Sequence, residues 1–400
     1  MRFVLRAPAH VSFGAGTSLE APAIAARFAP RVMLVVGGAS LERSGTLERI
    51  EGELARAGAT STVLRVAGEP DVRAIDDGAR LSCEAGCGVV LAVGGGSVID
   101  AAKAVAALAT NGGRAIDYLE DLAPPSSGRP RAVEREPLPV VAVPTTAGSG
   151  SEVTRNAVLR VAEARVKRSI RSDLMIPRVA IVDPDLSATA PLAVSASAGL
   201  DALTHLVEAY VSRNAQPTTD LLALEGIGHA ARALRRLADR AATAETYAAM
   251  ALASLWGGLA LANAGLGAVH GLVAPLGGRC AVPHGAGCGC LLAATLRTNL
   301  GALRARAPDS PVLGRFVQVA TALTGDAAAR PDHAADAVDA LRVALGVGPL
   351  ARYGVTASDL SPIVERARGG SMRTNPVELT DAELDAILRA SLGTEPTGSS

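Results

Sequence analysis

Short runs rich in valine alternate with helical stretches through the first half of this chain of 400 residues. Each run is bounded by glycine or proline, which predicts a strand buried on both faces. Strands separated by helices pair in parallel, because each helix returns the chain to the start of the next strand. We therefore expect a parallel α/β sheet with strands at 31–36, 61–67, 88–96, 138–146 and 178–184, and with helices that include 41–57, 71–86 and 97–111.

The character of the sequence changes after Asp183 and Pro184. Alanine, leucine and arginine dominate from there on, and the valine-rich runs give way to helical patterns up to about residue 393. The chain ends in GTEPTGSS, which is small, polar and expected to be disordered. We predict an α/β domain over 1–185, a helical domain over 186–393 and a disordered tail over 394–400.

Composition excludes several classes of function. The 39 basic and 39 acidic residues cancel, and aromatic residues make up 2% of the chain. Such a chain lacks the net field and the stacking surfaces typical of nucleic-acid binding. Five cysteines without CxxC pairs predict neither a disulfide framework nor a zinc ribbon, and we find no uninterrupted apolar run of about 18 residues. We expect a cytoplasmic chain that binds neither nucleic acid nor membrane.

Three histidines and one aspartate form a candidate metal site. Asp201 and His205 are four residues apart in a stretch with helical periodicity, so one helix face carries both. His270 and His284 follow, and Pro283, after a stretch with a proline and two glycines, predicts a bend between them. Any one of these histidines alone is more readily explained as a structural residue, so the argument depends on the set. Three imidazoles, one carboxylate and no thiolate suit Fe(II), Zn(II), Mn(II) or Co(II).

Two loops are candidates for binding phosphate groups. GGGSVIDAAK, Gly94 to Lys103, follows a predicted strand and opens a predicted helix, where free backbone N–H groups favour a negative charge. It differs from GxGxxG, and a tight structural turn is an equally good explanation of this segment alone. PTTAGSGSEVT, Pro144 to Thr154, adds a hydroxyl-rich loop after another strand. Two such loops on one sheet indicate a dinucleotide or a phosphorylated ligand.

With these two loops, the segments VDP, GLDALTHLVEAY, GAVHGLVAPLGG and VPHG resemble the iron-containing (group III) alcohol dehydrogenases over essentially the whole chain. The resemblance implies a dehydroquinate synthase-like architecture, with a dinucleotide-binding α/β domain and a helical metal-binding domain. It maps the metal ligands onto Asp201, His205, His270 and His284, with Fe(II) favoured and Zn(II) as the alternative. It maps the contacts of NAD or NADP onto Gly95, Gly96, Ser97, Asp100, Thr145, Thr146, Ser149, Asn156 and Lys167.

Two departures from the family pattern affect the expected chemistry. Gly38 occupies a position where the family commonly has an aspartate, whose carboxylate would repel the 2′-phosphate of NADP, so the choice between NAD and NADP stays open. Ala274 occupies the position of a common histidine, so no protein base is assigned and we expect water or a ribose hydroxyl to carry the proton. The resemblance also suggests residues for the wall of the substrate pocket: Leu261, Trp256, Asn156 and Ser371.

We expect an NAD(P)-dependent and metal-dependent alcohol dehydrogenase or aldehyde reductase, in which the metal acts as a Lewis acid. One alternative is a maleylacetate reductase-type enoate or keto reductase, a branch that departs from the family pattern at Asp201 and Asp100, both retained here. The other is a dehydroquinate synthase-like lyase, which needs a basic phosphate pocket; Arg279 is the exception among few basic residues in the metal segments. We expect an alcohol or aldehyde substrate and a homodimer or higher homo-oligomer.

Overall fold

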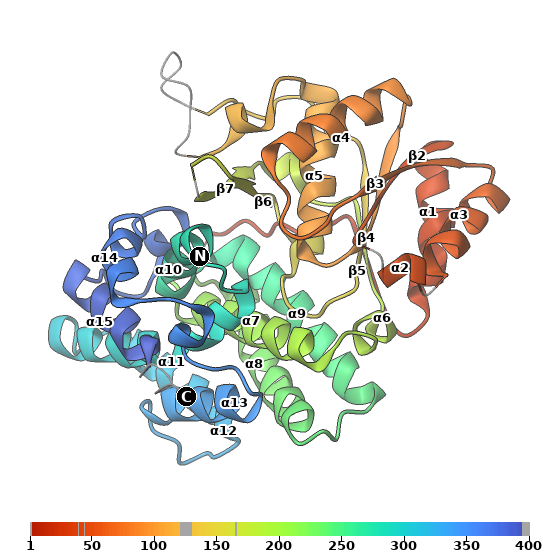
Figure 1. Ribbon diagram of the computed structural model, residues 1–400. Helices are drawn as coiled ribbons and strands as arrows, with labels where there is room; N and C mark the ends of the chain where they lie inside the picture. Colours follow the sequence, from red (N-terminus) through yellow and green to blue (C-terminus); the bar gives the residue numbers. More distant parts are fainter. Residues whose placement is uncertain (1, 39, 44, 121–129, 165, 394–400) are drawn as a thin grey trace, which may run out of the picture. The chain divides into compact units, whose positions relative to one another are not determined.

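The computed structural model describes residues 2–38, 40–43, 45–120, 130–164 and 166–393. These residues form two compact units (Figure 1), an α/β unit over Arg6–Thr146 and Gly150–Thr189 and a helical unit that takes in residues 2–5, 147–149 and 190–393. The predicted fold class, a parallel α/β domain followed by a helical domain, is confirmed. The predicted tail at 394–400 lies outside the described residues.

The α/β unit is built on a sheet of parallel strands in the order β1-β8-β5-β4-β2-β3. Its strands are β1 (His10–Phe13), β2 (Arg31–Val36), β3 (Thr60–Arg65), β4 (Val89–Gly94), β5 (Val140–Pro144) and β8 (Val179–Val182). The helices of this unit are α1 (Ala21–Phe28), α2 (Ser40–Arg43), α3 (Thr46–Arg56), α4 (Val72–Glu84), α5 (Gly96–Asn111) and α6 (Pro184–Ala188). Short 3-10 turns lie at η1 (Thr17–Glu20), η2 (Ala115–Tyr118), η3 (Ser151–Val153) and η4 (Asp173–Met175).

The central strands are apolar throughout because helices cover both faces of the sheet. Side chains alternate between the two faces along a strand. Met33 and Val35 of β2 accordingly join the core that contains residues of α4 and α5, whereas Leu34 and Val36 join the core that contains residues of α1 and α3. This two-sided burial explains the valine-rich runs of the sequence.

The sequence analysis described less well the strands whose residues are partly exposed. β3 was expected to be buried on both faces, but it lies at an edge of the sheet and is partly exposed. The edge strand β1 and the antiparallel hairpin β6 (Asn156–Val161) and β7 (Val166–Arg171) were not predicted. β1 has four residues, and β6 and β7 place charged residues between apolar ones, so none of them forms a continuous apolar run.

The helical unit follows the prediction for the second half of the chain. Its α-helices are α7 (Leu192–Val211), α8 (Pro217–Ala238), α9 (Ala244–Ala264), α10 (Ala268–Arg279), α11 (His284–Arg306), α12 (Val312–Thr324), α13 (His333–Ala344), α14 (Ala357–Glu365) and α15 (Asp381–Leu392). Two 3-10 turns, η5 (Leu350–Tyr353) and η6 (Gly370–Thr374), interrupt the later helices. A single large apolar core joins them.

Among the described residues, α9 is the one helix whose length and mean hydropathy of 1.2 would allow it to cross a membrane. It packs against α7 and α8, and 56% of its apolar window is buried inside the protein. A helix that is apolar on all sides is expected in the core of a helical unit. The packing of α9 therefore accounts for its composition.

Candidate metal centre and cofactor loops

Helix α7 presents three ionisable side chains on one face. Asp201, His205 and Glu208 are separated by four and three residues, which is the spacing of neighbours along a helix surface. All three are buried. Buried carboxylates and imidazoles need partners, because an unpaired charge away from water is costly. The face of α7 therefore requires complementary groups from the helices around it.

Glycines allow α11 to approach this part of α7 closely. A Cβ atom on Gly285 would lie 2.1 Å from the backbone oxygen of Ser197, and one on Gly289 would lie 2.7 Å from Cδ1 of Leu200. Side chains at these two positions of α11 would push the helices apart. Close packing brings His284, the first residue of α11, to the acidic face of α7.

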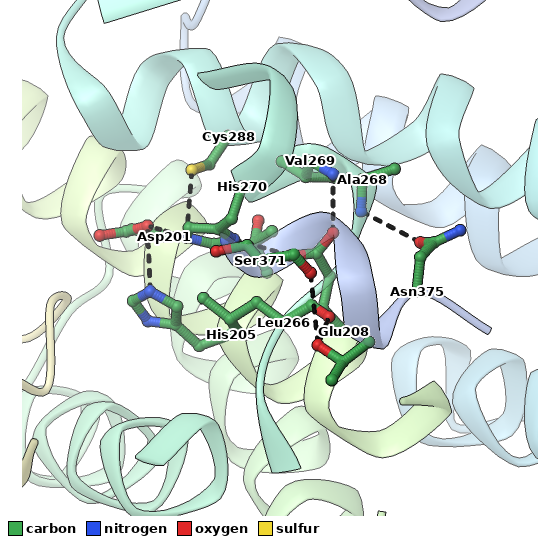
Figure 2. A network of polar contacts seen from close by, with 12 residues as sticks. Asp201, His205, Glu208, Leu266, Ala268, Val269, His270, Cys288, Ser371 and Asn375 are labelled. Carbon is green, nitrogen blue, oxygen red and sulfur yellow. Dashed lines mark hydrogen bonds and ion pairs between the residues drawn. The ribbon is translucent and has the colours of Figure 1, made fainter. Parts of the chain in front are cut away.

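The start of α10 is held by two side chains from distant parts of the chain (Figure 2). The backbone N–H of Ala268 donates to Oδ1 of Asn375 at 3.0 Å, and the N–H of Val269 donates to Oε1 of Glu208 at 2.7 Å. Both are amides of the first helical turn, which lack partners within the helix. These two contacts fix the position of His270, the next residue.

The three predicted histidine ligands converge on one carboxylate oxygen of the fourth, Asp201. Oδ1 of Asp201 lies 3.6 Å from Nε2 of His205, 3.5 Å from Nε2 of His270 and 3.6 Å from Nε2 of His284. Two donor atoms that are each about 2.1 Å from one ion lie about 3.4 Å apart in a tetrahedral site. This oxygen is buried and makes no hydrogen bond in the described structure. The donor set and its spacing fit a divalent metal ion.

Burial and mutual contact set the charge states of these groups. Burial alone would raise the pKa of Asp201, but the imidazoles of His205, His284 and His270 lower it below its ordinary range. Burial lowers the pKa of His205 to about 4, and the imidazoles of His270 and His284 act in the same direction. At neutral pH the site therefore offers a carboxylate and a neutral His205 imidazole, which are the forms that bind metal.

Glu208 orients one of the candidate ligands and was missed in the sequence analysis. Its Oε2 lies 2.7 Å from Nδ1 of His270. Because a carboxylate accepts, Nδ1 carries a proton in this contact, and Nε2, which faces Asp201, is the ring atom that would bind a metal ion. The available signal was the spacing of Glu208 from Asp201, seven residues along the same helix face.

A thiol also lies beside the four predicted ligands, although the sequence analysis described the set as free of thiolate. Sγ of Cys288 is 3.8 Å from Nε2 of His270 (Figure 2). Donor atoms of Asp201, His270, His284 and Cys288 all lie within 4.8 Å of one another. Burial raises the pKa of Cys288 to about 12. The signal in the sequence was the position of Cys288, four residues after His284 on α11.

The two candidate cofactor loops lie next to each other in the α/β unit. Gly94 at the end of β4 pairs with Pro144 at the end of β5, and the N–H of Thr145 donates to the backbone oxygen of Gly94 at 3.0 Å. Gly95 precedes α5, and a Cβ atom on it would lie 3.3 Å from Oγ1 of Thr146. The predicted contacts Gly96 and Ser97 lie in the first turn of α5, whose N–H groups suit an anion.

Asp100 and Lys103 of α5 bind groups of the hydroxyl-rich loop and hold it in place. The carboxylate of Asp100 accepts from the hydroxyl of Ser151 and, at 2.9 Å, from the N–H of Val158. Lys103 is fully buried, and its Nζ lies 3.0 Å from Asp100 Oδ1, 3.0 Å from the Ser151 backbone oxygen and 3.0 Å from Thr154 Oγ1. Asp100 was predicted to contact the cofactor; its described partners are groups of the protein that shape the loop.

The other predicted cofactor residues are more widely spread. Asn156 begins β6, and Lys167 on β7 pairs with Glu69. Ser149 groups with the helical unit rather than with the α/β unit. Gly38 follows β2, is exposed, and has nothing within 4 Å of a Cβ atom built on it. A side chain at this position would therefore be accommodated without a clash.

Three of the suggested pocket residues belong to the helical unit. Trp256 and Leu261 lie on α9, and Ser371 lies on η6. Trp256 is half-buried, and its ring meets that of His229 edge-on, with centroids 5.4 Å apart. Ala274 lies one turn beyond His270 on α10.

Comparisons with known proteins agree on one family. The sequence model described as iron-containing alcohol dehydrogenase matches residues 8–184, and the one described as the C-terminal part of the Fe-containing alcohol dehydrogenase family matches residues 195–392. A 1,3-propanediol dehydrogenase of Klebsiella pneumoniae is 36% identical over 320 residues, which is 79% of each chain.

Two solved structures share the fold over nearly their whole length. The crystal structure of a mutant of an archaeal halo-thermophilic alcohol dehydrogenase from a Red Sea brine pool has a TM-score of 0.90 at 26% identity, and the match covers 98% of this chain and 99% of the other. The crystal structure of sulfoacetaldehyde reductase from Bifidobacterium kashiwanohense in complex with NAD+ has a TM-score of 0.84 at 30% identity, with 99% and 100% covered.

Proposed function

The chain belongs to the iron-containing alcohol dehydrogenase family and is an oxidoreductase that acts on CH–OH groups; we propose that it is a divalent-metal-dependent and NAD(P)-dependent alcohol dehydrogenase or aldehyde reductase. We propose Asp201, His205, His270 and His284 as the ligands. The observation that carries this proposal is the buried Oδ1 of Asp201, which lacks a hydrogen bond and has three imidazole nitrogens around it.

Side chains of the protein set the charge and the orientation of the donor atoms that would hold the ion. Asp201 contributes the negative charge, and the buried His205 stays neutral at physiological pH. Glu208 accepts from Nδ1 of His270 and so directs Nε2 towards the other donors, where it would bind the ion. When bound there, a divalent ion supplies the Lewis acid that stabilises alkoxide charge while hydride passes between nicotinamide and the carbon of the substrate.

The imidazoles and one carboxylate suit Fe(II), Zn(II), Mn(II) or Co(II), and membership of the iron-containing family favours Fe(II), with Zn(II) as the alternative. We assign no protein base, since Ala274 offers no ionisable group on the face of α10 beyond His270. Water or a ribose hydroxyl is the proposed route for the proton.

We propose that the nicotinamide cofactor is bound by the two adjacent loops and the start of α5. The proposed contacts are Gly95, Gly96, Ser97, Thr145, Thr146, Ser149, Asn156 and Lys167, with Asp100 acting at least in part by shaping the loop. Two features support a dinucleotide, the helix N-terminus that follows β4 and the NAD+ bound by the related sulfoacetaldehyde reductase. The exposed Gly38 leaves NAD and NADP as alternatives. We further propose a cytoplasmic homo-oligomer that acts on a small alcohol or aldehyde.

A substrate panel before and after removal of metal tests the proposal. The protein is assayed with NADH and NADPH against aldehydes, and with NAD and NADP against alcohols, then treated with a chelator and reloaded with Fe(II) or Zn(II). We expect turnover that disappears on chelation and returns on reloading. Reduction of maleylacetate that is insensitive to chelation would overturn the metal-dependent assignment, and phosphate release from a phosphorylated substrate without net cofactor turnover would indicate a lyase.

A further inference from the structure

We propose that Cys288 is an additional donor of the metal centre and binds the ion through its sulfur. The inference rests on the proposed function, because it requires an ion beside Asp201. It adds a soft ligand to a set that otherwise consists of three imidazoles and one carboxylate. The proposal follows from the position of Sγ relative to the other donors.

The distance between Sγ of Cys288 and Nε2 of His270, 3.8 Å, fits two ligands of one ion. With a metal–nitrogen distance of about 2.1 Å and a metal–sulfur distance of about 2.3 Å, the two donors are about 3.6 Å apart at a tetrahedral angle and about 3.8 Å apart at 120°. The sulfur also lies within 4.8 Å of the donor atoms of Asp201 and His284. An ion placed between them would lie beside all four groups, a set that does not include His205.

The backbone holds Cys288 in this position. It follows His284 by one helical turn, so both side chains lie on the same face of α11. The residue is fully buried, and Gly285 and Gly289 on either side of it keep α11 close to α7. The burial of Cys288 and the close approach of α11 to α7 keep its thiol beside the other donors.

A second buried cysteine on the same helix, Cys290, has a different environment from that of Cys288. Cys290 is also buried, but its Sγ donates to the backbone oxygen of Gly348 at 3.0 Å. Its partner is an ordinary backbone acceptor, whereas Cys288 lies among carboxylate and imidazole groups. The two thiols thus provide a test residue and a matched control in one helix.

A thiolate ligand changes which ions the centre prefers. Sulfur favours Zn(II) and Co(II) over harder ions such as Mn(II) and Mg(II). The thiol proton passes to solvent when the metal–sulfur bond forms, so each ion bound in this way releases one proton from Cys288. The proposal therefore predicts a centre that retains thiophilic ions more firmly than its imidazole and carboxylate ligands alone would.

Absorption spectroscopy of the cobalt-substituted full chain tests the assignment. Metal-free protein receives no more than one equivalent of Co(II), and the near-ultraviolet band for charge transfer from sulfur to cobalt is recorded beside the visible ligand-field bands. We expect the charge-transfer band in the wild type and in Cys290→Ser, and its loss in Cys288→Ser. In competition with a chelator, Cys288→Ser should also bind Zn(II) about tenfold or more weakly than Cys290→Ser.

The wild-type spectrum alone can overturn the proposal, whatever the stability of the variants. Ligand-field bands without a sulfur band would show that cobalt occupies the centre without Cys288, which leaves the proposed function intact. A sulfur band that persists in Cys288→Ser would assign it to another thiol and also overturn the proposal. Failure of the wild type to bind cobalt any better than Asp201→Ala would overturn both the proposal and the metal-dependent function.

Discussion

The side chain of Glu208 has two roles in this protein. Its carboxylate caps the start of α10 through the N–H of Val269 and accepts from Nδ1 of His270. The sequence analysis selected Asp201 and His205 from their spacing but omitted Glu208, because its role depends on α10, which lies some sixty residues further along the chain. A contact between distant segments has no local signal in the sequence.

Glu208→Gln should weaken metal binding by about 10–100-fold. The amide of glutamine can donate to Nδ1 of His270, which favours the tautomer with its proton on Nε2, where the ion should bind. Competition with a chelator measures the effect in metal-free protein that is reloaded with Zn(II). Glu225→Gln, at an exposed position of α8, is the control and should bind normally. Equal affinity for the two variants would rule out the orienting role of Glu208.

Gly38→Asp should shift the preference for the cofactor towards NADH. The position follows β2, is exposed and has space for a side chain, so the substitution adds a carboxylate without a clash. Repulsion of the 2′-phosphate should lower kcat/KM for NADPH by about tenfold or more and leave that for NADH nearly unchanged. Steady-state kinetics with both cofactors provide the measurement. A parallel fall for both would place Gly38 away from the 2′ position.

Glu152 should make the α/β unit less stable as the pH rises. Burial raises the pKa of Glu152 from 4.5 to about 7, and Lys103 offsets this only in part. Because the folded-state pKa is the higher one, the contribution to stability is fully present below pH 4.5 and is lost as the pH rises through about 7. Above that range, Glu152→Gln should raise the free energy of unfolding by up to about 3 kcal/mol relative to the wild type.

Urea denaturation of wild type and Glu152→Gln across this pH range measures the difference. The two proteins should differ least at the acid end, where Glu152 is neutral in both the folded and the unfolded state. A difference in unfolding free energy that does not change with pH would contradict the assignment of the titration to Glu152.

At the scale of elements, the packing of α11 against α7 determines whether the ligands can meet. The glycines of HGAGCGC remove side chains where α11 contacts Ser197 and Leu200 of α7. Gly285→Ala places a methyl group against a backbone oxygen, so we expect a loss of about 1–3 kcal/mol in stability and weaker metal binding. Thermal unfolding and chelator competition measure the two effects.

Gly301→Ala on the same helix is the matched control. Nothing lies within 4 Å of a Cβ atom at that exposed position, so alanine should raise stability by up to about 1 kcal/mol through its higher helix propensity. Metal affinity should stay unchanged. If Gly285→Ala and Gly301→Ala both bound metal as the wild type does, the position of His284 would not depend on the close approach of α11 to α7.

The strands could be predicted from the sequence where their side chains are fully buried. β2, β4, β5 and β8 lie in continuous apolar runs, and all were expected from the sequence. The edge strand β1 is short and largely exposed, and the hairpin of β6 and β7 places charged residues between apolar ones, so these strands were missed. Cys288 was missed for a related reason, since its role depends on which helix face α11 turns towards α7.

At the scale of the whole molecule, the sequence indicated a parallel α/β unit followed by a helical unit, and the described residues form these two units. The α/β unit gives way to the helical unit between Thr189 and Ala190. Composition could not predict that residues 147–149 group with the helical unit, because that depends on contacts with Ala198 and its neighbours in α7.

The central claim is that one divalent ion, held by Asp201 and the three histidines, is required for hydride transfer. Its most direct test is a titration of metal-free protein with Fe(II) or Zn(II), in which bound metal and alcohol-dependent formation of NADH or NADPH are measured on the same samples. We predict that activity rises in proportion to bound metal and reaches a plateau at one ion per chain, and that Asp201→Ala shows neither. Full activity in the metal-free wild type, or activity that does not follow bound metal, would contradict the claim.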